Sequence, residues 1–93
     1  MDFQIKKKVK EGKVVKIEFD CNDVIRNIRI TGDFFLHPEN MLEEIEKSIV
    51  GLDRNADENT IISNIQKGIA VSDVQMMGIS PESIARLIKE ALG

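Results

Sequence analysis

The sequence predicts an α+β fold, a three-stranded antiparallel meander followed by about three helices covering one face of the sheet. Three observations predict it. Apolar and polar residues alternate through much of residues 3–31, which is the period of a strand. Two short polar segments interrupt this region, and connections that short force neighbouring strands to run antiparallel. From residue 38 onward, apolar residues recur every three or four positions, which is the period of a helix.

The strand region divides into three consecutive strands. The first covers residues 3–10 and carries apolar residues on one face, with lysines on the other. Glu11-Gly12 is a turn signal and leads into a second strand over residues 13–20. A polar corner at residues 21–23 precedes the third strand, which we expect over about 24–31.

Two helices are expected next. Pro38 suits the first turn of a helix, and Gly51 is a suitable C-terminal stop. The second helix is expected to begin after Asn55 or Asp57 and to end before Gly68. Asn55 has capping-box spacing to a glutamate three residues later.

The C-terminal part contains one ambiguous segment and one clear helix. In residues 69–79, alternation at Ile69, Val71 and Val74 indicates an extended segment, whereas Met76-Met77-Gly78 could close a helical turn. Ser80 as N-cap and Pro81 at the first helical position then predict a final helix. Its apolar residues follow the i, i+3, i+4, i+7 pattern.

Length and composition favour one domain over residues 1–93 without a complete active site of its own. The chain has 93 residues, 42% of them hydrophobic, which is typical of a small globular domain. One cysteine and one histidine cannot form a disulfide or a Cys/His zinc site. No apolar run is long enough for a membrane span, and no secretory signal is recognisable. A lone cysteine favours the reducing cytoplasm.

Charge is unevenly distributed. Residues 1–31 carry eight Lys or Arg against five Asp or Glu, and the remainder is acidic. Six lysines form a basic ribbon: Lys6, Lys7, Lys8, Lys10, Lys13 and Lys16. The ribbon is interpreted either as a solvated, edge-protecting strand face or as a surface facing a partner. No Tyr or Trp is available for base stacking, so nucleic acid is not the expected partner, and neither is a membrane.

Isolated candidates for chemistry have simple structural interpretations. Glu43, Glu44 and Glu46 are expected to form a solvated helix face rather than a catalytic pair. His37 is expected in an exposed loop without a catalytic partner. Cys21 lies beside an acidic residue, which disfavours a reactive thiolate. We therefore predict neither a catalytic residue nor a metal ligand on this chain.

Gly32-Asp33-Phe34-Phe35 is the least ordinary segment. Two consecutive phenylalanines on extended chain must point in opposite directions. One ring could then cap the core and the other could contact a partner. The alternative is that both rings fold under the first helix.

The sequence resembles the C-terminal accessory domain of lipoate–protein ligases over about residues 6–92. Gly32-Asp33-Phe34-Phe35 is its most specific segment. The other matching segments are Glu11-Gly12-Lys13-Val14-Val15, the apolar positions Ile17, Phe19, Ile25, Ile28 and Ile30, then Pro38-Glu39, Val50-Gly51-Leu52, and Met77 to Ile84.

The resemblance implies a role without catalytic residues. In that family a large domain holds the lipoate and ATP pockets, and the small domain is associated with activation of lipoate to lipoyl-adenylate. The lipoyl group then passes to a lysine of an acceptor domain. In some microbes the two domains are separate chains, and this chain, beginning at Met1 without a linker, looks like such a small subunit. ATP, magnesium and lipoate are then expected on the large subunit, with none on this chain.

The resemblance and the residues together give a site hypothesis. Gly32, Asp33, Phe34 and Phe35 are expected to form part of a docking surface for the large subunit, with one phenylalanine as anchor. Lys8, Lys10, Lys13 and Lys16 are expected to add a favourable field near phosphates or an acidic partner. The alternative from another class is a sulfur-transfer or iron–sulfur accessory protein using Cys21.

Overall fold

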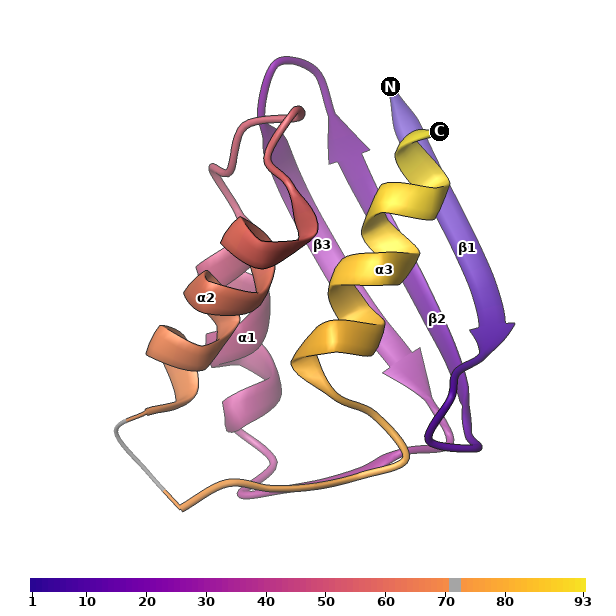
Figure 1. Ribbon diagram of the computed structural model, residues 1–93, viewed down its shortest axis with the longest axis vertical. Coiled ribbons are helices and arrows are strands. Elements are labelled where there is room, and N and C mark those ends of the chain that lie inside the picture. The colour runs from indigo at the N-terminus through magenta and orange to yellow at the C-terminus, as the bar shows by residue number, and fades with distance from the viewer. Residues whose placement is uncertain (71–72) are drawn as a thin grey trace.

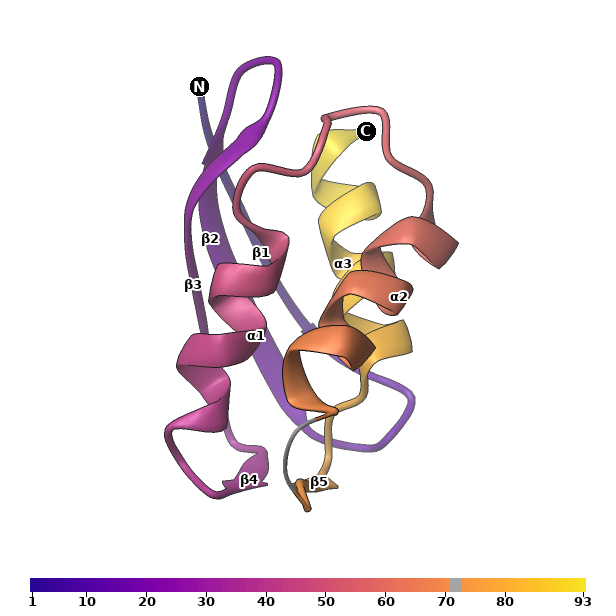
Figure 2. The same ribbon diagram turned by 90° about the vertical axis from the view of Figure 1, so that its left-hand side faces the viewer.

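The computed structural model describes residues 1–70 and 73–93, and these contain two sheets and three helices (Figure 1 and Figure 2). The elements in chain order are β1 (Asp2–Lys8), β2 (Val14–Cys21), β3 (Ile25–Gly32), β4 (Phe35–His37), α1 (Met41–Ile49), α2 (Glu58–Ile69), β5 (Gln75–Met77) and α3 (Pro81–Leu92). The predicted α+β fold is confirmed.

The predicted meander is present as a sheet in the order β1-β2-β3, with both pairs antiparallel. Ile17 of β2 lies opposite Ile5 of β1 and Ile30 of β3, so the apolar residues share one face. The register shifts between Phe19 and Cys21. Cys21 ends β2 as a fully buried residue, because the alternation of buried and half-buried positions along β2 continues to it, and the interpretation of this position as part of a polar corner was wrong.

The helices lie on the apolar side of this sheet (Figure 2). α1 contacts β3 and α3 contacts β1, while α2 packs chiefly against α1 and α3. The core between these layers is dominated by fully buried isoleucines, which explains a composition rich in this residue. Their positions are Ile17, Ile25, Ile30, Ile45, Ile49, Ile61, Ile65, Ile84 and Ile88.

The start of α1 differs from the prediction. The helix begins at Met41 after Asn40, whereas Pro38 lies before it and its carbonyl accepts a hydrogen bond from the amide of Met41 at 3.0 Å. The preceding residues are not a loop, because Phe35–His37 form β4. Burial of Leu36 in the core holds this segment extended.

The ambiguous segment before α3 contains a short strand but not the predicted alternation, because Ile69 belongs to α2 and Val74 precedes β5. Gln75–Met77 form β5, which pairs antiparallel with β4, so a helical turn at Met76-Met77-Gly78 was wrong. Val71, a member of the predicted alternation, lies outside the described residues. No local pattern indicated β4 and β5, because each three-residue strand depends on pairing with a distant one.

The start of α2 shows which of the two predicted N-terminal residues is correct. Asp57 is the N-cap and accepts a hydrogen bond from the amide of Thr60 at 2.8 Å, so the capping box at Asn55 was wrong. The helix also continues through Gly68 to Ile69. A Cβ on Gly68 would lie 3.1 Å from that of Ser48 on α1, so glycine here allows close packing of the two helices. The Ser80 cap of α3 is confirmed, with the amide of Ser83 donating at 3.1 Å.

Candidate docking surface

The β4–β5 ribbon presents two large apolar side chains to solvent. Phe35 of β4 lies directly opposite Met77 of β5, and they are 53% and 66% exposed. The ring of His37 stacks beside that of Phe35, with centroids 6.4 Å apart. Phe34 is half-buried and packs against the core. The prediction that one ring caps the core while the other is exposed is therefore confirmed, and Phe35 is the exposed one.

Gly32 determines how the chain enters this ribbon. Its φ of +151° is one that residues with side chains rarely adopt. A Cβ at this position would overlap the carbonyl oxygen of Val14 on β2. The next amide, of Asp33, donates to that same oxygen at 3.0 Å. Glycine therefore allows the chain to leave β3 in close contact with β2. This path of the backbone sets the directions in which Phe34 and Phe35 point.

The four candidate lysines do not form one cluster. Lys8 and Lys16 lie on the sheet face opposite the helices, and Lys16 pairs with Glu18 at 2.9 Å. Lys10 and Lys13 lie in and beside the turn between β1 and β2. The side chain of Lys13 lies over Gly78, immediately after β5, because a Cβ on Gly78 would overlap it. Lys13 is therefore the candidate lysine that the structure brings next to the β4–β5 strand pair.

Glu11 has a structural role that its place in a turn signal does not predict. Its carboxylate accepts hydrogen bonds from the hydroxyls of Ser80 and Ser83, the former at 2.9 Å. These contacts attach the β1–β2 turn to the N-terminus of α3, where a negative charge is favoured. Burial opposes ionisation, but the hydrogen bonds from Ser83 and Ser80 outweigh it and lower the pKa of Glu11 below its ordinary value of 4.5.

The substitution Glu11→Gln is expected to lower the free energy of unfolding at neutral pH. It should also make this free energy less dependent on pH in the acid range. A lowered pKa in the folded state stabilises the fold above the unfolded-state pKa, and this contribution is lost as the pH falls through the folded-state pKa. Urea unfolding between neutral pH and about pH 3 measures the effect. The difference between wild type and variant should shrink toward acid. A difference that stays constant or grows would contradict the linkage.

The remaining residues considered for catalysis or metal binding either have a structural role or are exposed. Glu46 was expected on a solvated face, but its carboxylate accepts a hydrogen bond from the amide of Ile30 at 2.8 Å and so caps the edge of β3. Glu43 and His37 are exposed, as expected. No group of three potential metal-ligating residues occurs in residues 1–70 and 73–93. Within the same residues, no helix is long and apolar enough to cross a membrane.

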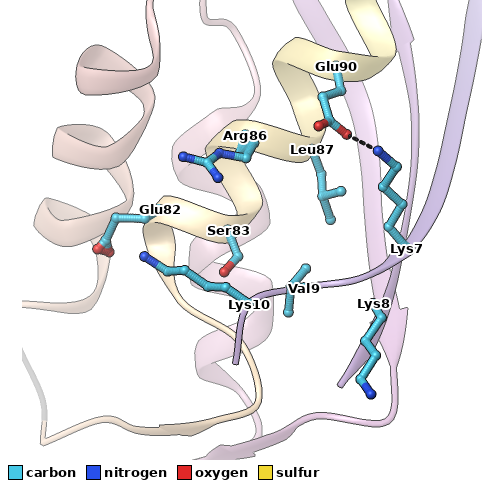
Figure 3. A pocket seen from close by; sticks show the side chains of 9 residues that line it. All are labelled: Lys7, Lys8, Val9, Lys10, Glu82, Ser83, Arg86, Leu87 and Glu90. Atoms are coloured by element: carbon cyan, nitrogen blue, oxygen red, sulfur yellow. Dashed lines mark ion pairs between the residues drawn. The ribbon is translucent and has the colours of Figure 1, made fainter. Parts of the chain in front are cut away.

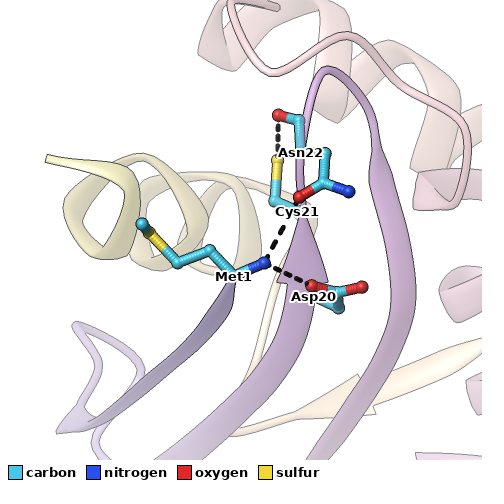
Figure 4. Close-up of polar contacts among 4 residues, drawn as sticks. All are labelled: Met1, Asp20, Cys21 and Asn22. Atoms are coloured by element: carbon cyan, nitrogen blue, oxygen red, sulfur yellow. Dashed lines mark hydrogen bonds and ion pairs between the residues drawn. The ribbon is translucent and has the colours of Figure 1, made fainter.

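Cys21 has the surroundings of a structural cysteine. Its side chain is fully buried, and Sγ lies 3.4 Å from the carbonyl oxygen of Asn22 (Figure 4). The N-terminal ammonium of Met1 lies at the same strand end, 2.9 Å from a carboxylate oxygen of Asp20. A sulfur donor or cluster could not reach the thiol in this conformation, so the structure gives no support to the alternative function based on Cys21.

Comparison with known proteins identifies the family. The family described as "Bacterial lipoate protein ligase C-terminus" matches residues 1–88. A solved structure from a study of an archaeal lipoylation system, a bi-partite lipoate protein ligase and its E2 lipoyl domain from Thermoplasma acidophilum, contains a chain of the same fold. The TM-score is 0.68 at 22% identity, covering 95% of this chain and 97% of that one. No curated protein sequence matches significantly. Since the family match extends over almost the whole sequence, the chain belongs to the family of lipoate protein ligase C-terminal domains.

Proposed function

We propose that this chain is the non-catalytic small subunit of a two-chain lipoate–protein ligase in the cytoplasm. With a large catalytic subunit it serves the ATP-dependent activation of lipoate to lipoyl-adenylate, which precedes lipoylation of acceptor-protein lysines. ATP, magnesium and lipoate bind to the large subunit. Membership of the family and the shared fold with a chain from a bi-partite ligase study support this proposal.

The exposed pair of Phe35 and Met77 is the observation that carries the proposal. Both belong to segments by which the sequence resembles the ligase accessory domain, although they are 42 positions apart and meet only through the β4–β5 pairing. Large exposed apolar side chains that gather on one small element mark contact sites for other proteins. Phe35 is the anchor of the docking surface, Met77 lies beside it, and Gly32, Asp33 and Phe34 hold the chain in position.

The proposed contribution of the small subunit is geometric. Adenylation requires the lipoate carboxylate and the α-phosphate of ATP to be held in line while water is excluded. A module docked beside the large subunit can close such a site without contributing a reacting group. Lys13, next to the β4–β5 pair, adds positive potential toward an acidic or phosphate-bearing partner, and Lys8, Lys10 and Lys16 add to it from the turn and from the other face of the sheet.

Phe35→Ala is expected to weaken the complex with the large subunit by about thirtyfold or more, the effect of losing a hot-spot side chain. The fold should survive, because Phe35 is 53% exposed. Titration calorimetry measures the affinity, and lipoate-dependent ATP–pyrophosphate exchange measures the activation step. Met77→Ala should act in the same direction.

Val50→Ala is the matched control, since Val50 is 48% exposed but lies at the end of α1, away from the ribbon. It should leave affinity and exchange unchanged. Equal affinity of Phe35→Ala and wild type would reject the docking surface. Full pyrophosphate exchange by the large subunit alone would reject the proposed function itself.

A further inference from the structure

β1 forms an open edge of the main sheet. The strand order β1-β2-β3 gives it a partner on one side, and no described residue pairs with its other side. Just beyond β1, the amide of Val9 donates to the carbonyl of Lys13 at 2.9 Å. Bonded positions alternate along an antiparallel ladder, so the odd-numbered residues of β1 bond to β2. Gln4, Lys6 and Lys8 therefore direct their backbone N–H and C=O groups away from the sheet.

A groove lies between this edge and α3 (Figure 3). Its apolar lining comes from Val9 and Leu87, and its volume is about 190 Å³. Pockets that enclose drug-sized ligands measure roughly 300 Å³ or more, so the groove suits individual side chains better than a nucleotide. An added strand beside β1 would direct every second side chain toward it.

The edge and the groove are basic although the whole chain carries a net charge of −3. Charged residues lining the groove are Lys7, Lys8, Lys10 and Arg86, against Glu82 and Glu90, and the side chain of Lys8 points away from α3 (Figure 3). Lys7 and Glu90 pair at 3.0 Å. Within residues 1–70 and 73–93, no ion pair involves Lys8, Lys10 or Arg86. The positive charges are thus available to an acidic partner.

Lys6 is in an unfavourable environment within the domain itself. It lies directly opposite Lys16 of β2, and like charges at such positions destabilise a sheet. Lys16 is compensated by Glu18 at 2.9 Å. Lys6 has no ion pair among the described residues. An acidic side chain at the corresponding position of an added strand would lie roughly 5 Å away and relieve this repulsion.

We propose that the free edge of β1 binds an extended acidic segment of a partner protein, which adds a fourth strand to the sheet. Main-chain hydrogen bonds to Gln4, Lys6 and Lys8 supply affinity, and the basic side chains select acidic residues. A second copy of this chain is disfavoured, because edge-to-edge pairing of two β1 strands would bring their lysines together. The proposal is independent of the docking surface on β4–β5.

Amide hydrogen exchange followed by NMR tests the proposal with a defined probe. The probe is a capped peptide of about eight alternating glutamate and threonine residues, a length typical of strands. Binding should slow exchange at Gln4, Lys6 and Lys8. The amides of Phe3, Ile5 and Lys7, which already bond to β2, are internal references. A peptide with lysine in place of glutamate should not bind.

Two substitutions at Lys6 separate backbone pairing from charge attraction. Lys6→Pro removes an outward N–H without removing a β1–β2 hydrogen bond, and it should weaken peptide binding more than about tenfold. Lys6→Gln keeps the N–H and should weaken binding by no more than about fivefold. Protection of the Phe3 and Ile5 amides reports whether each variant keeps the sheet.

Three results would overturn the proposal. One is absence of peptide binding to the wild-type chain. Another is peptide binding that leaves amide exchange at Gln4, Lys6 and Lys8 unchanged, because the peptide would then be held by charge attraction without strand pairing. The third is inorganic polyphosphate binding as tightly as the peptide, since it would show a general anion-binding surface.

Discussion

Gly32→Ala is expected to destabilise the domain by at least about 3 kcal/mol, from a strained backbone conformation together with steric overlap. Gly32 has a φ of +151°, and a methyl group there would overlap the Val14 carbonyl. That oxygen accepts the hydrogen bond from Asp33, so movement of either strand to relieve the overlap would also disturb the start of the β4 segment. Small domains have limited stability, so a loss of this size would remove a large share of the free energy of unfolding.

Gly51→Ala is the control for this prediction. Gly51 also has a positive φ, +92°, but nothing lies within 4 Å of where a Cβ would be. Its substitution tests backbone strain without overlap and should cost about 1–2 kcal/mol. Urea unfolding of both variants separates the two contributions. If the two variants lost equal stability, the close approach of Gly32 to β2 would contribute nothing.

Ile17→Ala is expected to have an effect of similar size, about 3–4 kcal/mol. Ile17 is fully buried in the central strand, with Ile5 and Ile30 opposite it on the two neighbouring strands. Because it is enclosed by sheet neighbours and by the helices above, its removal leaves a cavity that neighbouring side chains cannot readily fill.

The same substitution at Ile62 is the matched control. Ile62 lies on α2 and is half-buried, so shortening it removes fewer contacts and should cost about 1–2 kcal/mol. Urea midpoints and slopes for both variants measure the difference. A smaller loss for Ile17→Ala than for Ile62→Ala would contradict the position of Ile17 at the centre of the core.

The candidate docking surface was partly predictable. Consecutive phenylalanines on extended chain must diverge, but the sequence left open whether both rings fold under the first helix, and the extended chain at β4 decides for one exposed ring. Which ring is exposed depends on the departure of the chain from Gly32 and on the burial of Leu36. Met77 could not be assigned to this surface, because its neighbour Phe35 is 42 positions away and each three-residue strand has too little sequence for a recognisable period.

The sequence by itself determined the order of β1–β3 and of the three helices, the antiparallel meander and the identity of the buried face. These follow from side-chain periodicity and from connection lengths, which are local properties. Tertiary structure alone decided the β4–β5 pairing, the contact of Glu11 with Ser80 and Ser83, and the structural role of Glu46. These contacts join residues distant in the chain, and their partners are selected when the helices pack on the sheet and bring those groups within hydrogen-bonding distance.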